Sequence, residues 1–245
     1  MINRRNISVV IPAYNEEKNI GRTLVKIVDY FNKKRARPYE IIVVDDGGSD
    51  KTVEKVNYLI RKNKRIKLLK NGKNRGKGYS VKRGVLCAKY PLILFSDADL
   101  STPIEELDKF VDLIQKYDMV IASRNLKESD IQSKQPFYRT ILGKIFPLIV
   151  NILIFSDFKD TQCGFKLFKK DVVKEVFPLQ TFNGFSFDVE VLYIAKKKKY
   201  SIKEAPVVWM SSNKSEVSPL KDPIRMFRDV LKIKLNSMRG YYSKR

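Results

Sequence analysis

The stretch LILFSDADLSTP, residues 92–103, changes from a strand-like run to an acidic loop within a few positions. Its first four residues suit a buried strand, and two carboxylates follow, at Asp97 and Asp99. Side chains of an extended segment repeat with a period of two, so we expect both carboxylates to point the same way. The stretch therefore predicts a buried strand that ends in paired negative charge, within a chain whose formal net charge is +22.

Other strand-like runs alternate with amphipathic stretches of helical length along the chain. The pattern predicts strands at Ile7–Ile11, Glu40–Val44, Ile66–Leu69, Leu92–Phe95 and Met119–Ala122. It predicts helices at Glu16–Phe31, Thr52–Arg61, Gly78–Ala88 and Pro103–Gln115, the last with Thr102 as its cap. Alternation of this kind is typical of an α/β fold in which helices flank a mostly parallel central sheet.

Three polar loops follow predicted strands: PAYNEE after the first, DDGGSD after the second and SDADLS after the fourth. Ligands of open α/β sheets bind outside the carboxyl ends of the strands. We therefore expect these three loops to face a common cleft.

The composition excludes several kinds of catalytic site. The 245 residues include no histidine and only two cysteines, Cys87 and Cys163, which are not in a CxxC spacing. Zinc sites and Ser-His or Cys-His triads are thereby excluded. Neither GxxxxGK[ST] nor a GxGxxG that opens a helix is present, so an ATPase or a dinucleotide-binding protein loses its main support. The N-terminus turns polar too early for a signal peptide, which indicates a cytosolic compartment.

The excess of basic residues is compatible with three explanations: nucleic acid, an anionic membrane surface or phosphate-rich substrates, or a generally Lys-rich proteome. Lys and Arg fall mainly in predicted helices, linkers and the C-terminal tail, without the interleaved aromatic residues of a single-strand binder. A basic nucleic-acid-binding protein therefore stays as an alternative of a different class, although we do not expect nucleic acid as a partner.

Two segments of the C-terminal half combine apolar and basic residues. Arg139–Phe155 is the most apolar part of the chain, but basic and polar residues interrupt it, so it is too short and broken to cross a bilayer. It is either a core helix or a pair of helices at a membrane interface. Ile224–Met238 predicts a basic amphipathic helix. We expect a catalytic domain at 1–221, followed by this helix and a tail at 222–245, and no transmembrane helix.

The paired carboxylates have a chemistry of their own. Asp97 and Asp99 offer hard oxygen ligands without histidine or cysteine, and such ligands suit Mg²⁺ or Mn²⁺. An ion of this kind completes its coordination shell with water and substrate phosphates. Acidic residues at strand ends are also common as helix caps or solvated loop residues, so the pair by itself leaves both interpretations open.

A set of motifs occurs in order along the chain: VVIPAYNEE, EIIVVDDGGSDKT, NRGKGYSVKRG, FSDADL and ASRN. In this order they resemble the motif set of the family 2 glycosyltransferases of GT-A fold. The later motif DTQCGFKLF, residues 160–168, resembles the signature of the dolichyl-phosphate β-glucosyltransferase branch, close relatives of the polyprenyl-phosphate mannose synthases. The resemblance runs from Ile7 to about Asp229 and implies a Rossmann-like GT-A catalytic domain.

The resemblance also implies roles for individual residues. Nucleotide-sugar binding is implied for Pro12, Ala13, Tyr14, Glu16, Val44, Asp46, Lys77, Asp97, Ala98 and Asp99. Binding of Mg²⁺ or Mn²⁺ is implied for Asp97 and Asp99, with Ser101 as a further candidate ligand. The implied catalytic residues are Asp97, Asp99, Arg124 and Arg139, and the implied contacts of an acceptor phosphate are Arg124, Arg139 and Lys214.

Two positions depart from the family pattern. Gly48 stands where DDGSxD has serine, which we expect to alter loop anchoring more than chemistry. Glu216 stands where a late W…SKV element has lysine, and this departure leaves the role of the nearby Lys214 open. Asp160 or Asp188 is expected to orient the sugar hydroxyls, although Asp188 suits a helix-capping role equally well.

The implied activity is inverting, metal-dependent transfer of glucose from UDP-glucose to a dolichyl or polyprenyl monophosphate, for glycan or protein glycosylation. GDP-mannose or UDP-N-acetylglucosamine as donor, a soluble acceptor, and an inactive sugar-nucleotide-binding module stay open. A lipid acceptor implies peripheral attachment to the cytosolic face of an anionic membrane, through residues 139–155 and 224–238.

Overall fold

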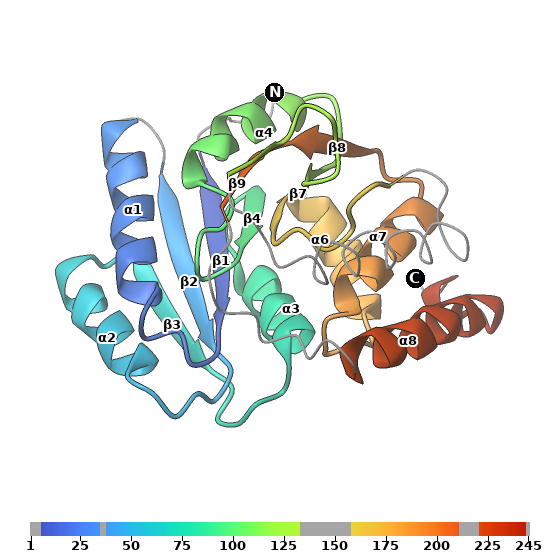
Figure 1. Cartoon of the computed structure of the whole chain (residues 1–245), viewed down its shortest axis with the longest axis horizontal. Coiled ribbons are helices and arrows are strands. Elements are labelled where there is room, and N and C mark those ends of the chain that lie inside the picture. Colours follow the sequence, from blue (N-terminus) through green and yellow to red (C-terminus); the bar gives the residue numbers. More distant parts are fainter. Residues whose placement is uncertain (1–5, 35–37, 133–157, 211–220, 244–245) are drawn as a thin grey trace.

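The computed structural model describes residues 6–34, 38–132, 158–210 and 221–243, which form a seven-stranded sheet between two layers of helices (Figure 1). The strand order is β3-β2-β1-β4-β7-β5-β8. These strands are β1 (Ile7–Ala13), β2 (Tyr39–Asp45), β3 (Ile66–Lys70), β4 (Leu92–Ser96), β5 (Met119–Ser123), β7 (Phe165–Lys169) and β8 (Ile202–Pro206). A small second sheet pairs β6 (Asp130–Ile131) with β9 (Val208–Trp209). The expected α/β fold with a mostly parallel sheet is confirmed.

Helices cover both faces of the sheet because the central strands are apolar on both faces. Val9 and Ile11 of β1 share one core cluster with α1, α2 and α4, whereas Val10 packs on the opposite face with α3, α6, α7 and α8. The helices are α1 (Ile20–Lys33), α2 (Thr52–Lys62), α3 (Lys77–Cys87), α4 (Leu107–Leu113), α6 (Lys170–Val176), α7 (Phe187–Lys197) and α8 (Lys221–Met238). Short 3₁₀ turns lie at η1 (Ile104–Glu106), η2 (Phe177–Leu179) and η3 (Tyr241–Ser243).

The five predicted strands are all present, with ends close to those expected. The sequence did not predict β7, which inserts between β4 and β5 and runs antiparallel to both. This insertion depends on pairing between segments distant in sequence, which no local pattern reports. It brings the loop before β7 beside the acidic loop after β4.

Two predicted helix starts were wrong. The first helix begins at Ile20, four residues later than expected, and the backbone N–H of Glu16 donates to Thr52 Oγ1 at 2.8 Å. The N–H of Glu17 likewise donates to Asp50 Oδ2 at 2.9 Å. These bonds attach the loop after β1 to the loop after β2, and residues 17–19 form a turn that leads into α1.

Thr102 was also expected to cap a helix, and this prediction was wrong. The chain continues from Pro103 into η1 and then α4, and the Thr102 hydroxyl lies 3.6 Å from Cys163 Sγ. Thr102 is therefore part of the contact between the acidic loop and the loop before β7.

The C-terminal helix packs into the main core. Met226, Val230 and Ile233 of α8 are buried in the same cluster as α7. Tyr242, just after the helix, is also buried, and its hydroxyl donates to Glu190 Oε1 at 2.8 Å. α8 thus shares its core with the preceding elements. The division of the chain at residues 221 and 222 stays a prediction from sequence.

None of the helices in the described ranges is both long and apolar enough to cross a bilayer. The apolar segment 139–155 lies outside the described residues.

Candidate active site

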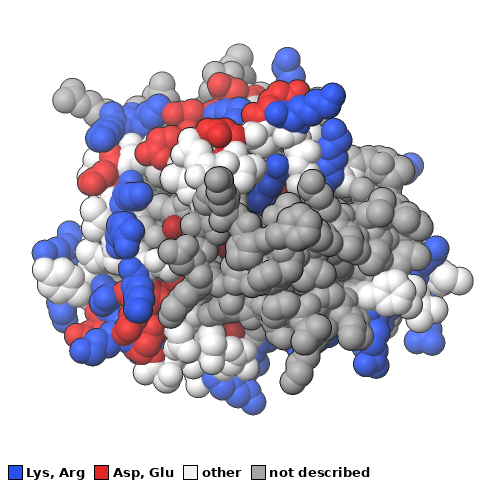
Figure 2. All heavy atoms as spheres, viewed as in Figure 1, with Lys and Arg blue, Asp and Glu red and all other residues white. Residues whose placement is uncertain are grey.

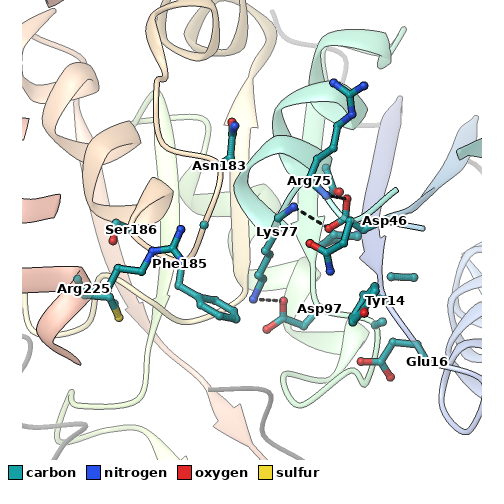
Figure 3. A pocket seen from close by; sticks show the side chains of 18 of the residues that line it. Tyr14, Glu16, Asp46, Arg75, Lys77, Asp97, Asn183, Phe185, Ser186 and Arg225 are labelled. Atoms are coloured by element: carbon teal, nitrogen blue, oxygen red, sulfur yellow. Dashed lines mark hydrogen bonds and ion pairs between the residues drawn. The ribbon is translucent and has the colours of Figure 1, made fainter. Parts of the chain in front are cut away.

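The loops after β1, β2 and β4 meet at a cavity of about 690 Å³ (Figure 3). Because the carboxyl ends of parallel strands lie at one edge of a sheet, residues far apart in sequence converge there. The cavity is lined by Pro12, Ala13, Tyr14, Glu16, Asp46, Asn74, Arg75, Gly76, Lys77, Ser80, Asp97, Ala98, Asp99, Asn183, Gly184, Phe185, Ser186, Arg225, Met226 and Asp229. The common cleft expected from the three loops is therefore present.

Asp97 is fixed at the cavity by a backbone contact and by a lysine. Its N–H donates to the carbonyl oxygen of Gly164 at 2.9 Å, and Lys77 Nζ lies 2.7 Å from Asp97 Oδ1. Burial acts to lower the pKa of Lys77, but nearby carboxylates, Asp97 first among them, outweigh it and raise that pKa overall. Lys77 is therefore a cation at neutral pH and offsets the repulsion that Asp97 would exert on a substrate phosphate.

Asp99 is oriented by its own loop. The Ser101 N–H donates to Asp99 Oδ1 at 3.0 Å, and the Ser101 hydroxyl donates to Asp99 Oδ2 at 2.7 Å. Leu100, between them, has a φ of 50°, in the left-handed region that leucine rarely adopts. Such backbone strain persists where surrounding contacts enforce it, and the Leu100 side chain is buried. Ser101, a candidate metal ligand by resemblance, thus contacts the carboxylate of Asp99.

The two carboxylates fit a hard divalent cation. Asp97 and Asp99 both line the cavity, and carboxylate oxygens can accept further bonds beside those described. Oxygen ligands suit Mg²⁺ or Mn²⁺. Within the described part of the chain, no group of three or more His, Cys, Asp or Glu side chains comes together to hold a metal. Asp97 and Asp99 would therefore share such an ion with substrate phosphates and water.

Asp46, which directly follows β2, organises the glycine-containing loop before α3. Its Oδ1 accepts hydrogen bonds from Asn71 Nδ2 at 2.7 Å and from the Arg75 N–H at 3.0 Å. Its Oδ2 accepts one bond, from the Gly76 N–H at 2.8 Å. Gly76 has a φ of 99°, a backbone conformation that residues other than glycine rarely adopt. Asp46 thus shapes the cavity wall while Oδ2 keeps a lone pair for a ligand.

The departure at Gly48 has a structural counterpart at Asn15. A Cβ at position 48 would lie 2.9 Å from Asn15 Oδ1, so the Asn15 side chain fills the space that a serine would need. The same Oδ1 accepts a hydrogen bond from the Ser49 N–H at 2.9 Å. Asn15 has a φ of 53°, in a region that asparagine tolerates better than most residues. Asn15 therefore anchors the loop that the missing serine was expected to anchor.

The other residues singled out from sequence lie in three kinds of place. Val44 is fully buried in the core, and Ser101 and Arg124 are not among the described residues that line the cavity. Arg139 and Lys214 lie outside the described residues. The cavity is lined by the remaining residues assigned by resemblance, which are Pro12, Ala13, Tyr14, Glu16, Asp46, Lys77, Asp97, Ala98 and Asp99.

Arg124 and Asp160 bind one another. Arg124 Nε lies 2.6 Å from Asp160 Oδ2, and Arg124 Nη2 lies 2.9 Å from Oδ1, which is a two-point contact. The Arg124 N–H also donates to Oδ2 at 3.0 Å. Burial acts to raise the pKa of Asp160, but the Arg124 guanidinium lowers it overall. Asp160, expected to orient sugar hydroxyls, is thus fully buried and committed to Arg124.

Cys163 and Lys166 of the DTQCGFKLF motif are buried beside the acidic loop. Burial raises the pKa of the Cys163 thiol to about 11, so this thiol stays protonated and is unsuited to nucleophilic attack. Lys166 is buried, and its Nζ lies 2.6 Å from Asp188 Oδ1 and 2.7 Å from the Cys163 carbonyl oxygen. Asp188 therefore neutralises a buried lysine, and neither expected role, sugar binding or helix capping, is needed to explain it.

Sequence reasoning missed one wall of the cavity. Asn183, Gly184, Phe185 and Ser186 lie in the loop before α7, and Arg225, Met226 and Asp229 lie on α8. The loop is held by Glu190, which accepts bonds from the Thr181 N–H, the Thr181 hydroxyl and the Phe182 N–H. A loop without periodicity gives no local signal, although the apolar and basic pattern of α8 marked that helix as unusual.

Comparison with known proteins assigns this arrangement to a family. A family model described as glycosyl transferase family 2 matches residues 8–177. The chain belongs to glycosyltransferase family 2. The family inferred from the motifs is thereby confirmed, and the protein is a glycosyltransferase.

Several family 2 relatives carry the same name. Dolichyl-phosphate beta-glucosyltransferase of Dictyostelium discoideum is 36% identical over 248 residues, covering 96% of this chain and 76% of the relative. The enzyme of that name from Saccharomyces cerevisiae is 31% identical, with 96% and 76% of the two chains covered. The one from Homo sapiens is 33% identical, with 96% and 77% covered.

Solved structures support the fold of the family 2 chain. Glucosyl-3-phosphoglycerate synthase from Mycobacterium tuberculosis, in complex with Mn²⁺, UDP and glucosyl-3-phosphoglycerate, gives a TM-score of 0.68 at 16% identity, covering 95% of this chain and 79% of the other. Mannosyl-3-phosphoglycerate synthase from Rubrobacter xylanophilus gives 0.70 at 17% identity, covering 98% and 76%. At this identity the similarity concerns the GT-A-type α/β fold.

Replacing Gly164 of this family 2 enzyme with alanine is expected to reduce turnover by about 10²-fold, because small displacements of reacting groups have effects of that size. A Cβ at Gly164 overlaps the Asp97 carboxylate, so the carboxylate must rotate away from Lys77. Steady-state kinetics would measure the loss. Gly21→Ala is the matched control, because a Cβ at Gly21 has open space around it. Equal turnover in both variants would contradict the importance of the Asp97 position.

Proposed function

We propose that this protein transfers glucose from UDP-glucose to a polyprenyl or dolichyl monophosphate and gives a β-linked lipid-phosphate sugar. The observation that carries the proposal is the cavity at the carboxyl ends of β1, β2 and β4. This cavity combines Asp97 and Asp99 with the loops after β1 and β2. Support for the substrates comes from relatives named dolichyl-phosphate beta-glucosyltransferase and from structural neighbours solved with UDP and Mn²⁺.

The nucleotide sugar would lie along the walls formed by the loops after β1 and β2. Tyr14 offers a flat ring for the base, and Glu16 and Asp46 offer oxygen acceptors for ribose or base donors. Pro12, Ala13 and Ala98 give a compact, weakly polar surface beside them. Figure 3 shows Tyr14, Glu16 and Asp46 on one side of the cavity, with Asp97 and Lys77 between them and the opposite wall.

Departure of the nucleotide diphosphate requires that its growing negative charge be neutralised. Asp97 and Asp99 would hold the Mg²⁺ or Mn²⁺ ion, which when bound acts as a Lewis acid toward the diphosphate. Lys77 adds a fixed cation at the same place. Because the loops hold these groups before the substrate arrives, little reorganisation is needed during the reaction.

The acceptor needs no general base. The second pKa of a phosphate monoester is about 6, so at neutral pH it is largely a dianion. One of its oxygens attacks the anomeric carbon, the bond from that carbon to the nucleotide diphosphate breaks, and the diphosphate leaves with the electron pair. In-line displacement inverts the α-linked donor to a β-linked product. A chain without histidine is well suited to this reaction.

The lipid acceptor places the enzyme at a membrane surface, and α8 offers a suitable contact. The exposed apolar side chains Phe227, Leu231, Leu235 and Met238 follow one another along one side of the helix, and we name them the apolar stripe. Where α8 reaches the surface at the lower right of Figure 2, the described side chains in view are uncharged or basic. An apolar strip bordered by basic residues matches anionic headgroups over an acyl boundary. We propose that the site lies at such a membrane, on its cytosolic face.

Introducing charge into the apolar stripe should weaken membrane binding without unfolding the protein. Leu231→Glu combined with Leu235→Glu is expected to lower partitioning onto vesicles with anionic lipids by about 10-fold or more, since each buried leucine contributes about 1.5–3 kcal/mol. Liposome flotation measures the bound fraction. Leu86→Glu, at a leucine on α3 that is 45% exposed, provides the control. Equal flotation of both variants would remove α8 from the membrane contact.

The function is tested by a panel of nucleotide sugars with and without a polyprenyl phosphate and a divalent metal. We expect label to pass from UDP-glucose to the lipid phosphate, and chelation of the metal to stop it. Transfer from GDP-mannose or UDP-N-acetylglucosamine, or transfer only to a soluble sugar, would replace the proposed donor or acceptor. Salt-sensitive binding to nucleic acid without sugar transfer would contradict the proposal altogether.

A further inference from the structure

Helix α8 presents three different sides. Arg225 and Asp229 line the cavity, and at 3.6 residues per turn their positions differ by only roughly 40° around the helix. Met226, Val230 and Ile233 form the side that is buried in the core. The apolar stripe forms the third side and faces solvent. One helix therefore connects the cavity with the surface proposed to contact lipid.

Arg225 is a cation of the cavity wall that has no carboxylate partner among the described residues. Asp229, one turn further along α8, accepts a hydrogen bond from the Ser186 hydroxyl at 2.7 Å instead. The other described cations of the cavity each have a partner within the protein. Lys77 is paired with Asp97 at 2.7 Å, and Arg75 Nη1 lies 3.3 Å from the Tyr79 hydroxyl.

The position of Arg225 separates it from the nucleotide side. In Figure 3 the Arg225 side chain extends from α8 into the cavity beside Phe185 and Ser186. Tyr14 and Glu16 lie on the opposite side of the view. An anion bound by Arg225 would thus occupy the end of the cavity that the nucleotide loops leave open.

Arg124, the cation assigned by resemblance to this task, is engaged by a different group. Its guanidinium makes two contacts with the buried Asp160, at 2.6 and 2.9 Å. Breaking a charge-assisted pair of this geometry to bind a substrate would expose a buried carboxylate without its partner. Arg225 can bind an anion at no such cost.

We propose that Arg225 binds the phosphate of the lipid acceptor, an inference that rests on the proposed function. Guanidinium groups bind phosphate oxygens in a two-point geometry, which also orients the phosphate for attack. The apolar stripe would hold α8 at the headgroup level, where the phosphate of a membrane lipid lies. The acceptor then enters from the α8 side and meets the donor sugar in front of Asp97.

Equilibrium binding of farnesyl phosphate to the intact protein tests this assignment directly. Arg225→Ala is expected to weaken Kd by about 10-fold or more, the usual effect of losing a charged hydrogen bond, and Arg225→Lys should recover part of it. In kinetics, the KM for the lipid phosphate should rise by a similar factor while the KM for the nucleotide sugar is unchanged. Arg61→Ala, at an exposed arginine in the last turn of α2 that does not line the cavity, should behave as wild type.

Two results would overturn the assignment: an Arg225→Ala variant that binds farnesyl phosphate as the wild type does, or one in which the KM for the nucleotide sugar rises equally. Matching thermal melting of the Arg225→Ala and wild-type proteins excludes misfolding as the cause. If the wild type binds farnesyl phosphate in an Arg225-dependent way but transfers no sugar to it, the proposed function fails and the binding assignment holds. If the wild type does not bind farnesyl phosphate, the assignment itself is wrong.

Discussion

Asp99→Ala is expected to lower metal-dependent sugar transfer by about 10²–10³-fold, as loss of a preorganised group that stabilises transition-state charge typically does. Asp99 lines the cavity, and both of its oxygens are oriented by Ser101. Without this carboxylate, Asp97 alone would hold the divalent cation, and Asp97 is shared with Lys77. Turnover of UDP-glucose with a polyprenyl phosphate, measured over a range of Mn²⁺ concentrations, gives the effect.

Asp108→Ala is the control for this variant. Asp108 lies on α4 and contacts Lys34 and Tyr30 at the surface, where single ion pairs contribute little. Its removal should leave turnover unchanged. A second measurement, Mn²⁺-dependent binding of UDP by calorimetry, should weaken only in Asp99→Ala. Undiminished turnover of the Asp99 variant at low Mn²⁺ concentration would show that Asp99 is not a metal ligand.

Lys166→Met is expected to reduce the free energy of unfolding by about 3–5 kcal/mol, the usual effect of removing one partner from a buried ion pair. Lys166 is 1% exposed, and its Nζ contacts both Asp188 and the Cys163 carbonyl oxygen. Methionine fills a similar volume, so the loss comes mainly from the buried carboxylate left without its cation. Denaturation in urea, followed by circular dichroism, measures the change.

The neighbouring Lys169 provides a matched comparison on the same strand. Lys169 Nζ lies 3.0 Å from Asp118 Oδ1, but both side chains are partly exposed. Lys169→Met should therefore cost only about 0–1 kcal/mol. If the two variants were destabilised equally, burial of the Lys166 pair would not be the source of its contribution. Replacing Lys166 and Asp188 together by apolar residues should restore much of the stability.

The first half of the fold could be predicted because its strands are buried on both faces. Runs such as SVVIPA and EIIVVD have a length and β-branched content that favour strands over helices. The rule that ligands bind at the carboxyl ends of strands then predicts that Tyr14, Asp46, Asp97 and Asp99 lie together. Local pattern and topology were sufficient for these elements.

The rest depends on contacts between distant segments. Neither the insertion of β7 nor the approach of Gly164 to Asp97 follows from a period or a cap signal. The loop before α7 reaches the cavity because Glu190, buried on α7, binds its backbone. The amphipathic pattern of 224–238 predicts one apolar face, whereas the structure divides the apolar residues between a buried side and an exposed side. A helical projection cannot separate two adjacent apolar sides.

The contact between Asn15 and Gly48 bears on how this loop can have evolved. Because the Asn15 amide occupies the space of a side chain at position 48, the two positions are not free to change independently. Asn15 belongs to the motif VVIPAYNEE, so only Gly48 departs from the family pattern here. With serine at 48, the Asn15 amide would have to leave the Ser49 N–H to make room. Relatives with serine at 48 should therefore hold the Asn15 side chain in a different position.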